Sequence, residues 1–314
     1  MTDETPDVQT STGERSTFRT FIQTPRGKCA VGIGVLLVAL GLLAGQVYTR
    51  PVTDPLVRAM ANVFPFPALS VDGRMVTIQD FLQEYDALGS YFEDAGQEAP
   101  PHEQLEIAIA DTMINKIAIA QLAQRYGVEL DQERVEQYYQ EVLSSQESQE
   151  AFEQSLSETF GWTVEEFKTR IVESIVLALQ MTDVVLADAP TQQPRRDLID
   201  AAFARVQSGE DFATIAKDVH AGFEGIEGDL GYVKASAIPE SWASQVTTLE
   251  EGDTTQIIEL PEGYALFKLE EKIVAGEDTQ LHLLSITVPK VSLEEVVKKY
   301  LAGVKVKRYV GKTE

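Results

Sequence analysis

A run of nineteen residues without a charged side chain, Cys29 to Val47, is the strongest constraint that this sequence places on its fold. At about 1.5 Å of rise per residue, an α-helix of this length just crosses a hydrocarbon core of about 30 Å. Unpaired backbone groups are costly in lipid, so a segment inside a bilayer must be helical. Four basic residues precede the run: Arg15, Arg19, Arg26 and Lys28. This excess of positive charge predicts a single membrane helix over residues 29–48, with a cytoplasmic N-terminus and an extracytoplasmic remainder.

Three other interpretations of the run stay open. A cleaved signal peptide is one, although the run is long and no A-x-A cleavage site follows it. A lipoprotein anchor is another, although Cys29 begins the apolar run instead of ending it. The third is a buried core helix, which the flanking charges and the polar tail disfavour. Residues 1–28, rich in Thr, Ser, Asp, Glu and Gln, are expected to form a disordered cytoplasmic tail.

Composition excludes several classes of function. The net charge of −24 over 314 residues argues against nucleic-acid binding, which needs clustered Lys and Arg. Cys29 is the only cysteine, so no intrachain disulfide is possible. Three widely separated histidines make a metal site improbable, and the sequence has no Walker loop, H-E-x-x-H or G-x-S-x-G motif. We therefore expect neither a metal nor a cofactor.

The region 69–187 reads as a short hairpin followed by helices. An Asp72-Gly73 turn separates two short apolar strands, and Thr77 begins the first helix with Asp80 three residues later. The next helix has apolar residues at helical spacing: Leu105, Ile109, Met113, Ile117 and Leu122. Further helices are predicted from Gln132 to Leu143, from Gln149 to Phe160 and from Thr163 to about Leu186.

This order of elements resembles the N-terminal chaperone domain of SurA- and PrsA-type foldases. The steps R-Y-G-V-E-L-D-Q-E-R-V and F-G-W-T-V-E-E-F-K, which join helices here, are similar to the corresponding steps in that domain. The resemblance covers about 120 residues. An unrelated helical bundle is the competing interpretation, because helical periodicity is a loose pattern.

Residues 188–194, with two prolines and no periodicity, predict a linker, and a second domain is expected over residues 195–288. Five short motifs follow one another there: G-E-D-F-A-T-I-A, E-G-D-L-G-Y, I-P-E-S-W, E-E-G-D-T-T and E-G-Y-A-L-F. Their order and spacing resemble the parvulin (PpiC-type) family of peptidyl-prolyl isomerases. The whole chain thus resembles membrane-anchored foldases of the SurA, PrsA and PpiD type. Such a domain is a compact α/β unit with a four-stranded antiparallel sheet.

The first strand of the family, of the form A-x-H-I-L, is missing before residue 195. A strand of this type occurs instead at the other end of the domain, as Q-L-H-L-L-S-I-T-V over residues 280–288. Circular permutation explains this, because the first and last strands of the fold are neighbours. A chance H-L-L sequence and the vestige of a second domain are the alternatives. Residues 289–314 predict a helix and a strand that return to the chaperone domain, as in SurA-type proteins.

The resemblance also implies site residues. Substrate contacts are expected at Leu230, Ile238, Trp242 and Tyr264, and permutation makes His282 the candidate catalytic residue, beside Ile238 and Trp242. The family's closing-strand histidine is Ala265 here, and its Asp or Cys after the first helix falls at Ala221 or Gly222. His220 is the one nearby polar substitute. The site therefore keeps most of the family's apolar side chains but lacks most of its polar ones.

The expected fold is α+β: a membrane helix, a mostly helical chaperone domain and a parvulin-like domain. The expected function is that of a membrane-anchored extracytoplasmic foldase, a prolyl isomerase with a partly degenerate site. Its partners would be unfolded or newly exported polypeptides with X-Pro segments, together with the membrane that holds it. Two alternatives remain: a holdase that binds X-Pro segments without catalysis, and a structural envelope protein related by fold only.

Overall fold

The computed structural model describes residue 41, residues 45–274 and residues 279–312, and it divides them into two compact units. One unit extends to Ile114 and includes residues 305–314, and the other comprises residues 115–304. The predicted disordered tail and most of the predicted membrane helix fall outside the described residues. Within the described ranges, no helix combines the length and the apolar character needed to cross a bilayer.

The first unit is built around a short hairpin. Strands β1 (Pro67–Val71) and β2 (Arg74–Thr77) pair antiparallel. Asp72 and Gly73 form the turn with φ values of 47° and 85°, as a tight hairpin turn requires. Thr77 then begins α4 (Ile78–Asp94) with a reciprocal capping box to Asp80. Helix α3 (Pro55–Ala61) precedes the hairpin, and the first part of α5 (His102–Tyr126) completes the helices of this unit.

The C-terminal strand belongs to the same sheet. β7 (Val306–Arg308) pairs antiparallel with β1, which gives the strand order β2-β1-β7. Arg308 forms an ion pair with Asp111 on α5, and the last described turn packs closely on that helix. A Cβ at Gly311 would lie 2.5 Å from the carbonyl oxygen of Glu106, and the φ of Gly311 is +58°. Only glycine fits this approach without a shift of the backbone.

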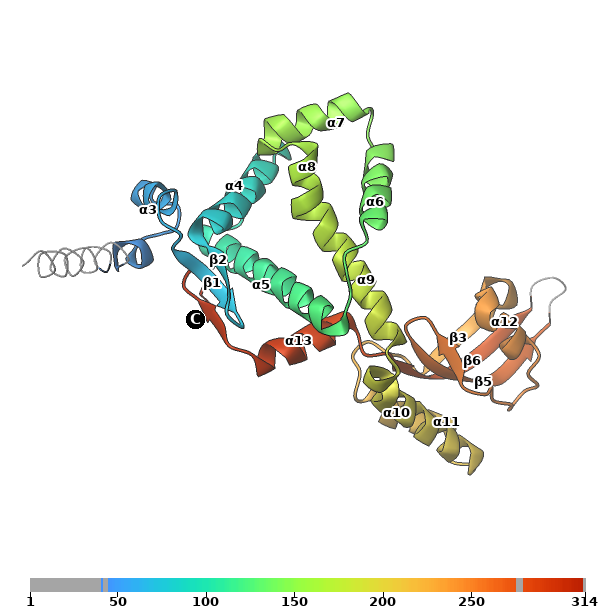
Figure 1. The fold of residues 1–314 in the computed structure, drawn as a ribbon. Helices are drawn as coiled ribbons and strands as arrows, with labels where there is room; N and C mark the ends of the chain where they lie inside the picture. Colours follow the sequence, from blue (N-terminus) through green and yellow to red (C-terminus); the bar gives the residue numbers. More distant parts are fainter. Residues whose placement is uncertain (1–40, 42–44, 275–278, 313–314) are drawn as a thin grey trace, which may run out of the picture. The chain divides into compact units, whose positions relative to one another are not determined.

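The second unit begins with the remainder of α5 and a series of helices that turn back on themselves (Figure 1). Asp131, Ser148 and Thr163 each cap the start of a helix with a side-chain oxygen. A small core of Val135, Val172 and Val176 joins the first and last of these helices. The elements are α6 (Gln132–Ser144), α7 (Gln149–Ser155), α8 (Val164–Phe167) and α9 (Glu173–Ala187), with π-helical turns at Leu156–Phe160 and Lys168–Val172.

Residues 188–194, predicted as a linker, are helical instead. They form the cap and the first turns of α10 (Ala189–Gln207), and Asp188 accepts a hydrogen bond from the backbone N–H of Thr191. Pro190 lies in the first turn, where a backbone N–H has no helical partner anyway. Buried Gln192 holds the segment in place, because its amide bonds the backbone of Val185 and of Val291. Pro190 therefore belongs to the start of a helix, and Pro194 lies inside the same helix.

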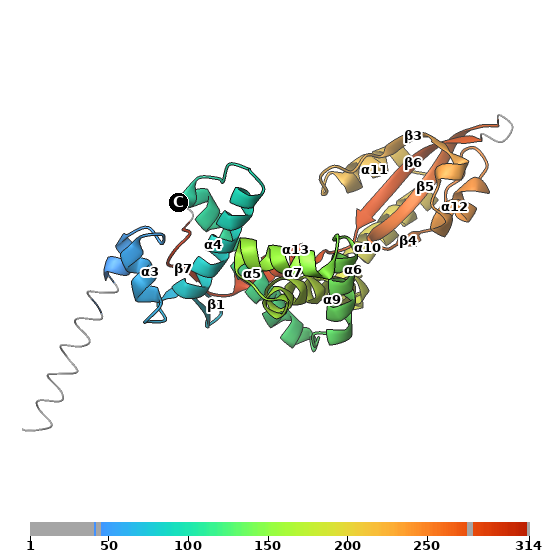
Figure 2. The same ribbon diagram turned by 90° about the horizontal axis from the view of Figure 1, so that it is seen from above.

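A four-stranded antiparallel sheet forms the rest of the second unit, in the order β3-β6-β5-β4. Helix α13 follows the last of these strands, and Figure 2 shows β5 and β6 running side by side over much of their length. The elements are α11 (Phe212–His220), β3 (Asp229–Lys234), α12 (Glu240–Thr247), β4 (Ile258–Leu260), β5 (Gly263–Ile273), β6 (Gln280–Pro289) and α13 (Leu293–Gly303), with a 3₁₀ turn at Ala235–Ala237.

Each face of this sheet has its own apolar layer, because side chains alternate along β5 and β6. On one face, Leu266 and Ile286 pack against α10 and α11; we call this the α10–α11 layer. On the other face, Phe267 and Leu283 pack with α12 and Ile238; we call this the α12 layer. The two layers account for the near-continuous burial of β5.

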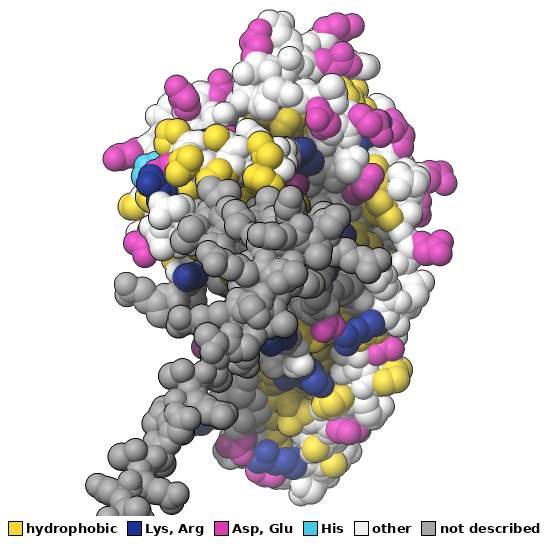
Figure 3. Space-filling model, turned by 60° about the vertical axis from the view of Figure 1, so that its left-hand side comes forward, with side chains coloured by type: hydrophobic (Ala, Val, Ile, Leu, Met, Phe, Trp, Pro, Cys, Tyr) yellow, Lys and Arg dark blue, Asp and Glu magenta, His cyan; other side chains and the backbone are white. Residues whose placement is uncertain are grey.

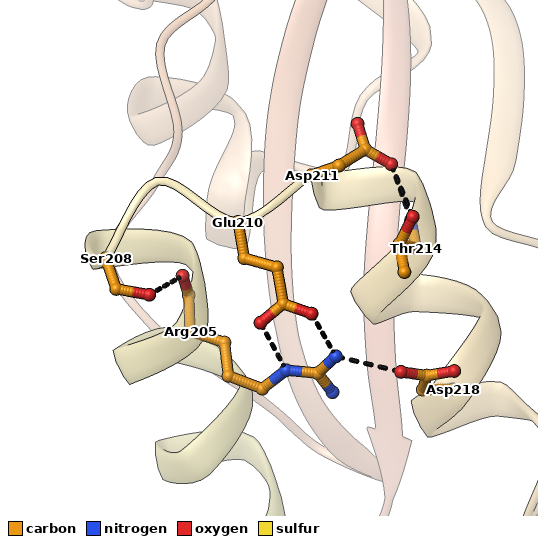
Figure 4. Close-up of polar contacts among 6 residues, drawn as sticks. All are labelled: Arg205, Ser208, Glu210, Asp211, Thr214 and Asp218. Carbon is orange, nitrogen blue, oxygen red and sulfur yellow. Dashed lines mark hydrogen bonds and ion pairs between the residues drawn. The ribbon is translucent and has the colours of Figure 1, made fainter.

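The turn between α10 and α11 is held by an arginine fork. The Arg205 guanidinium bonds both carboxylate oxygens of Glu210 and reaches Asp218 on α11, while Asp211 caps α11 by accepting from Thr214 (Figure 4). The hydrogen bonds from Arg205 hold the pKa of the Glu210 carboxyl below its usual value. The G-E-D-F-A-T motif thus has a structural explanation as the link between two helices that cover the sheet.

Candidate functional site

The strand at residues 280–288 occupies the centre of the sheet. β6 pairs with β3 on one side and with β5 on the other, in the position that a permuted first strand would take. Only the loop between β5 and β6 connects it to the preceding strand. The sequence motif and the sheet order therefore agree on where this strand lies.

Ile238 and Trp242 come together at the start of α12. Ile238 is 6% exposed and belongs to the α12 layer. The indole ring of Trp242 stacks on the ring of Phe267, with 4.4 Å between centroids and 5° between planes. Pro239 separates Ile238 from the helix and serves as its N-cap, which fixes the direction in which α12 leaves the sheet. The half-buried Trp242 ring gives this face a partly exposed apolar surface.

The strand positions next to this surface carry small side chains. Ala265, in the place of the family's closing-strand histidine, is fully buried in the α12 layer. Its partner across the strand pair is Thr287 on β6. Directly paired residues have Cβ atoms about 4.5–5.5 Å apart on the same face, so the Thr287 hydroxyl group is the polar group nearest Ala265 across the pair. This arrangement offers one hydroxyl group where the family places an imidazole.

The prediction that His282 lies beside Trp242 and Ile238 is wrong. His282 alternates with Leu281 and Leu283, which belong to the α12 layer, so its side chain is on the other face of the sheet. There its ring stacks on Tyr232 at 4.9 Å, and its Nε2 lies 2.8 Å from Asp229 Oδ1. The Gly231 N–H and the His282 ring hold the pKa of the Asp229 carboxyl below its usual value.

The α12 layer in which Trp242 packs does not include two other predicted substrate contacts, Tyr264 and Leu230. Tyr264 is 5% exposed in the α10–α11 layer, where Arg196 and Lys290 each approach its ring to 5.5 Å. The prediction that Tyr264 shares a pocket with Ile238 and Trp242 is therefore wrong, and strand alternation is the reason. Leu230 is the extra residue of a bulge between Asp229 and Gly231 and is 41% exposed.

His220 has a structural task at the edge of the sheet. It is the last residue of α11, it is 8% exposed, and its Nε2 accepts a hydrogen bond of 2.9 Å from the backbone N–H of Thr287. Burial lowers the pKa of the imidazole, which favours the neutral ring that this bond requires. Gly228 packs beside it, since a Cβ there would lie 3.2 Å from Ala216 Cβ. The first glycine of G-D-L-G thus allows a close approach of α11 to the sheet.

Sequence reasoning missed Thr287 and Ser285. Ser285 is 2% exposed and its hydroxyl donates to the carbonyl oxygen of Glu227. The side chains of Ser285 and Thr287 both face the α12 layer, because they are two residues apart on β6. In the sequence, the only signal for this was the alternation of polar and apolar residues in S-I-T-V. The polar positions of a permuted strand can be assigned only when its register in the sheet is known. The H-L-L motif suggested a register in which His282 faces Trp242, and this register differs from the observed one.

Comparison with known proteins identifies the domain. The PPIC-type PPIase domain of the rotamase family matches residues 175–271. This range ends before β6, so the strand that completes the sheet lies beyond the matched residues. The position of β6 outside the match is what a permuted domain would give.

The relatives found for the whole chain are SurA chaperones. The chain is 26% identical over 214 residues to the SurA chaperone of Pseudomonas putida, which covers 59% of this chain and 49% of that protein. It is 22% identical over 293 residues to SurA of Alcanivorax borkumensis, covering 79% and 66%. The chain therefore spans about half to two thirds of the length of these relatives.

Among solved structures, the PrsA foldase protein of Lactococcus lactis is similar with 12% identity and a TM-score of 0.27, over 76% of this chain and 83% of that one. The domain match and the SurA relatives confirm the resemblance to SurA-type foldases with a parvulin domain.

Proposed function

We propose that this protein is an extracytoplasmic chaperone whose parvulin domain binds X-Pro segments of exported polypeptides and accelerates their isomerisation little. The SurA relatives and the PPIC-type domain support the chaperone assignment. The low catalytic activity is inferred from one observation. On the sheet face where Trp242 packs, Ala265 pairs with Thr287, so no imidazole is present at that position.

Prolyl isomerisation has a barrier because the C–N bond loses resonance as it twists. A catalyst must bind the twisted amide better than the planar forms, and polar groups aimed at the amide supply much of that preference. Here the closing-strand position is a methyl group, and the predicted His282 is on the far face. His220, the remaining imidazole nearby, is bonded to a backbone amide. Loss of a single such polar group costs about 10²–10³ in kcat in enzymes where it has been removed.

Apolar binding has a separate basis. The Trp242 ring is held flat by Phe267, so it is rigid before a ligand arrives and loses little entropy on binding. A proline ring packs well on such a surface, and neighbouring residues need no fixed sequence. We therefore assign binding of proline-containing segments to the outer face of Trp242, with Ile238 supporting it from below.

Attachment to the membrane is a further part of the proposal, and it depends on the sequence of residues 29–47. The test is extraction of membranes that contain the full chain with alkaline carbonate. An anchored chain stays in the membrane fraction, whereas release into the supernatant would remove this part of the proposal without affecting the chaperone assignment.

The chaperone assignment is tested by aggregation of an unfolded, proline-rich client in the presence of the full chain. Suppression that weakens in Trp242→Ala but persists in His282→Ala is the expected result, because only Trp242 is on the binding face. Equal suppression by all three proteins would show that the parvulin domain takes no part in client binding. Absence of suppression by the unchanged protein would contradict the chaperone assignment itself.

A catalytic isomerase is the second candidate function, and Thr287 favours it. Its hydroxyl group is on the same face as Trp242 and next to Ala265. If the unchanged protein accelerates isomerisation and Thr287→Val removes the acceleration, Thr287 supplies the polar group and the domain is an enzyme.

A further inference from the structure

Helix α3 is apolar on the side that faces solvent as well as on the side that faces its unit. Val57, Met60 and Ala61 are buried in the first unit. On the outer side, Leu56 within α3 is 42% exposed, and Val63, two residues after the end of the helix, is 70% exposed. Exposed apolar side chains that gather in one region of a surface often mark a contact with a partner or a membrane.

The exposed apolar residues follow one another along a short segment. Ala59 is exposed within α3, and Phe64 follows Val63 directly with 38% exposure. We call Leu56, Ala59, Val63 and Phe64 the α3 patch. Figure 3 shows hydrophobic side chains gathered in groups on the face of the molecule that it presents, with Asp and Glu scattered around them.

The charges around the α3 patch are neutralised in pairs. Arg58, the charged residue within α3, forms two hydrogen bonds of 2.7 Å to the carboxylate of Asp86. Arg50 pairs with Asp54 at 3.1 Å just before the helix. The patch thus carries none of the excess negative charge that distinguishes the chain as a whole, and an anionic surface would not repel it through these groups.

The end of the apolar run Cys29–Val47 is fixed to the same unit. Tyr48, the next residue, packs on Tyr309 at 5.6 Å and on Phe66 at 6.4 Å, and its hydroxyl donates to the carbonyl oxygen of Pro67. Val47 and Val52 are each 2% exposed. The first unit therefore cannot move away from the point at which the apolar run ends, and the α3 patch begins only nine residues after Val47.

We propose that the α3 patch lies in the interfacial layer of a lipid bilayer and holds the first unit on the membrane surface. The inference rests on the proposed membrane attachment, because it takes the bilayer that residues 29–47 would cross as the partner. Apolar side chains of interfacial segments reach about 5–10 Å into the boundary between headgroups and acyl chains. Phe64 fits this layer as well, since aromatic residues are enriched there.

The test uses the full chain in vesicles of phosphatidylcholine and phosphatidylglycerol without other protein. Cys29→Ser removes the natural cysteine, and a polarity-sensitive fluorophore is attached in Val63→Cys or, as the matched control, in Met75→Cys. Met75 is also a large hydrophobic residue of the first unit and is 67% exposed. Both positions are at the surface, so both variants are expected to fold.

Spin-labelled lipids should quench the probe at position 63 several-fold more strongly than the probe at position 75, and its emission should be blue-shifted. Weak quenching at both positions in vesicles that retain the protein after carbonate treatment would overturn this inference and leave membrane attachment standing. Equally strong quenching at both positions would also overturn it, because the contact would not be specific to the α3 patch. Release of the protein by carbonate would overturn attachment and the inference together.

Discussion

The imidazole of His220 accepts a hydrogen bond of 2.9 Å from the backbone N–H of Thr287, and this bond joins the end of α11 to the free edge of β6. Beyond Leu284, β6 has no further pairing with β3 in the described register. The bond therefore takes the place of a missing strand partner for a buried part of the sheet. It also explains why a histidine next to the family's polar position is not available to the substrate amide.

Replacement of this histidine should destabilise the second unit. In His220→Ala the N–H of Thr287 loses its partner, and a buried donor without a partner costs about 1–3 kcal/mol. The free energy of unfolding from urea titration measures the loss. His282→Ala is the matched control, because His282 bonds only the exposed side chain of Asp229 among the contacts described, so its replacement should change stability much less.

Acid should weaken the same contact. The pKa of His220 is lowered in the folded protein, so below the usual value of 6.5 the unfolded chain binds more protons than the folded one. By linkage, stability rises with pH in that range and falls as pH is lowered from 7 toward 5. Urea midpoints at several pH values test this. His220→Gln, which does not titrate, should flatten the dependence, and an equally steep dependence in that variant would assign it to other groups.

Gln192 should be important for the segment that joins the helices to the sheet. Its amide is 3% exposed and makes bonds of 2.8–3.0 Å to Val185 and Val291. Gln192→Ala removes these three bonds and takes from the Val291 N–H its described partner, at a cost of about 1–3 kcal/mol. The neighbouring Gln193 is exposed and bonds only Asp197 among the contacts described, so Gln193→Ala should be nearly neutral. Similar unfolding curves for the two variants would contradict this account.

Gly311 should tolerate no side chain. Its φ of +58° costs an alanine about 1–2 kcal/mol, and the Cβ would also meet the Glu106 carbonyl at 2.5 Å. Gly311→Ala is therefore expected to loosen the C-terminal turn from α5, with faster proteolysis after Lys305 or Lys307. Gly303→Ala has open space around the new methyl group and should be neutral or stabilising.

Local signals in the sequence predicted most of the elements. The hairpin at Asp72-Gly73, the caps at Thr77 and Thr163 and the helix at Ser292 all appear where turn and capping chemistry places them. The segment 188–194 misled because two prolines favour a linker in isolation, while the Asp188 cap and the buried Gln192 bonds depend on the surrounding structure.

The site was harder to predict than the fold. Ile238 and Trp242 lie in one layer because both are in one short segment at the start of α12, and their role as substrate contacts stays a prediction. His282 and Tyr264 required the register and the face of each strand, and a shift of one residue moves a side chain to the other face. Sequence spacing alone does not give the register or the face of a strand that follows the rest of the domain in the chain.

The central claim is that the parvulin domain binds X-Pro segments and accelerates their isomerisation little. Exchange NMR on a short proline-containing peptide measures both properties in one sample, as shifts of the peptide signals and as the cis–trans exchange rate. The account predicts saturable shifts with the full chain, weakened in Trp242→Ala, and an exchange rate within about tenfold of the uncatalysed one, whose timescale is tens to hundreds of seconds. An exchange rate raised by a thousandfold or more at substoichiometric protein would contradict it.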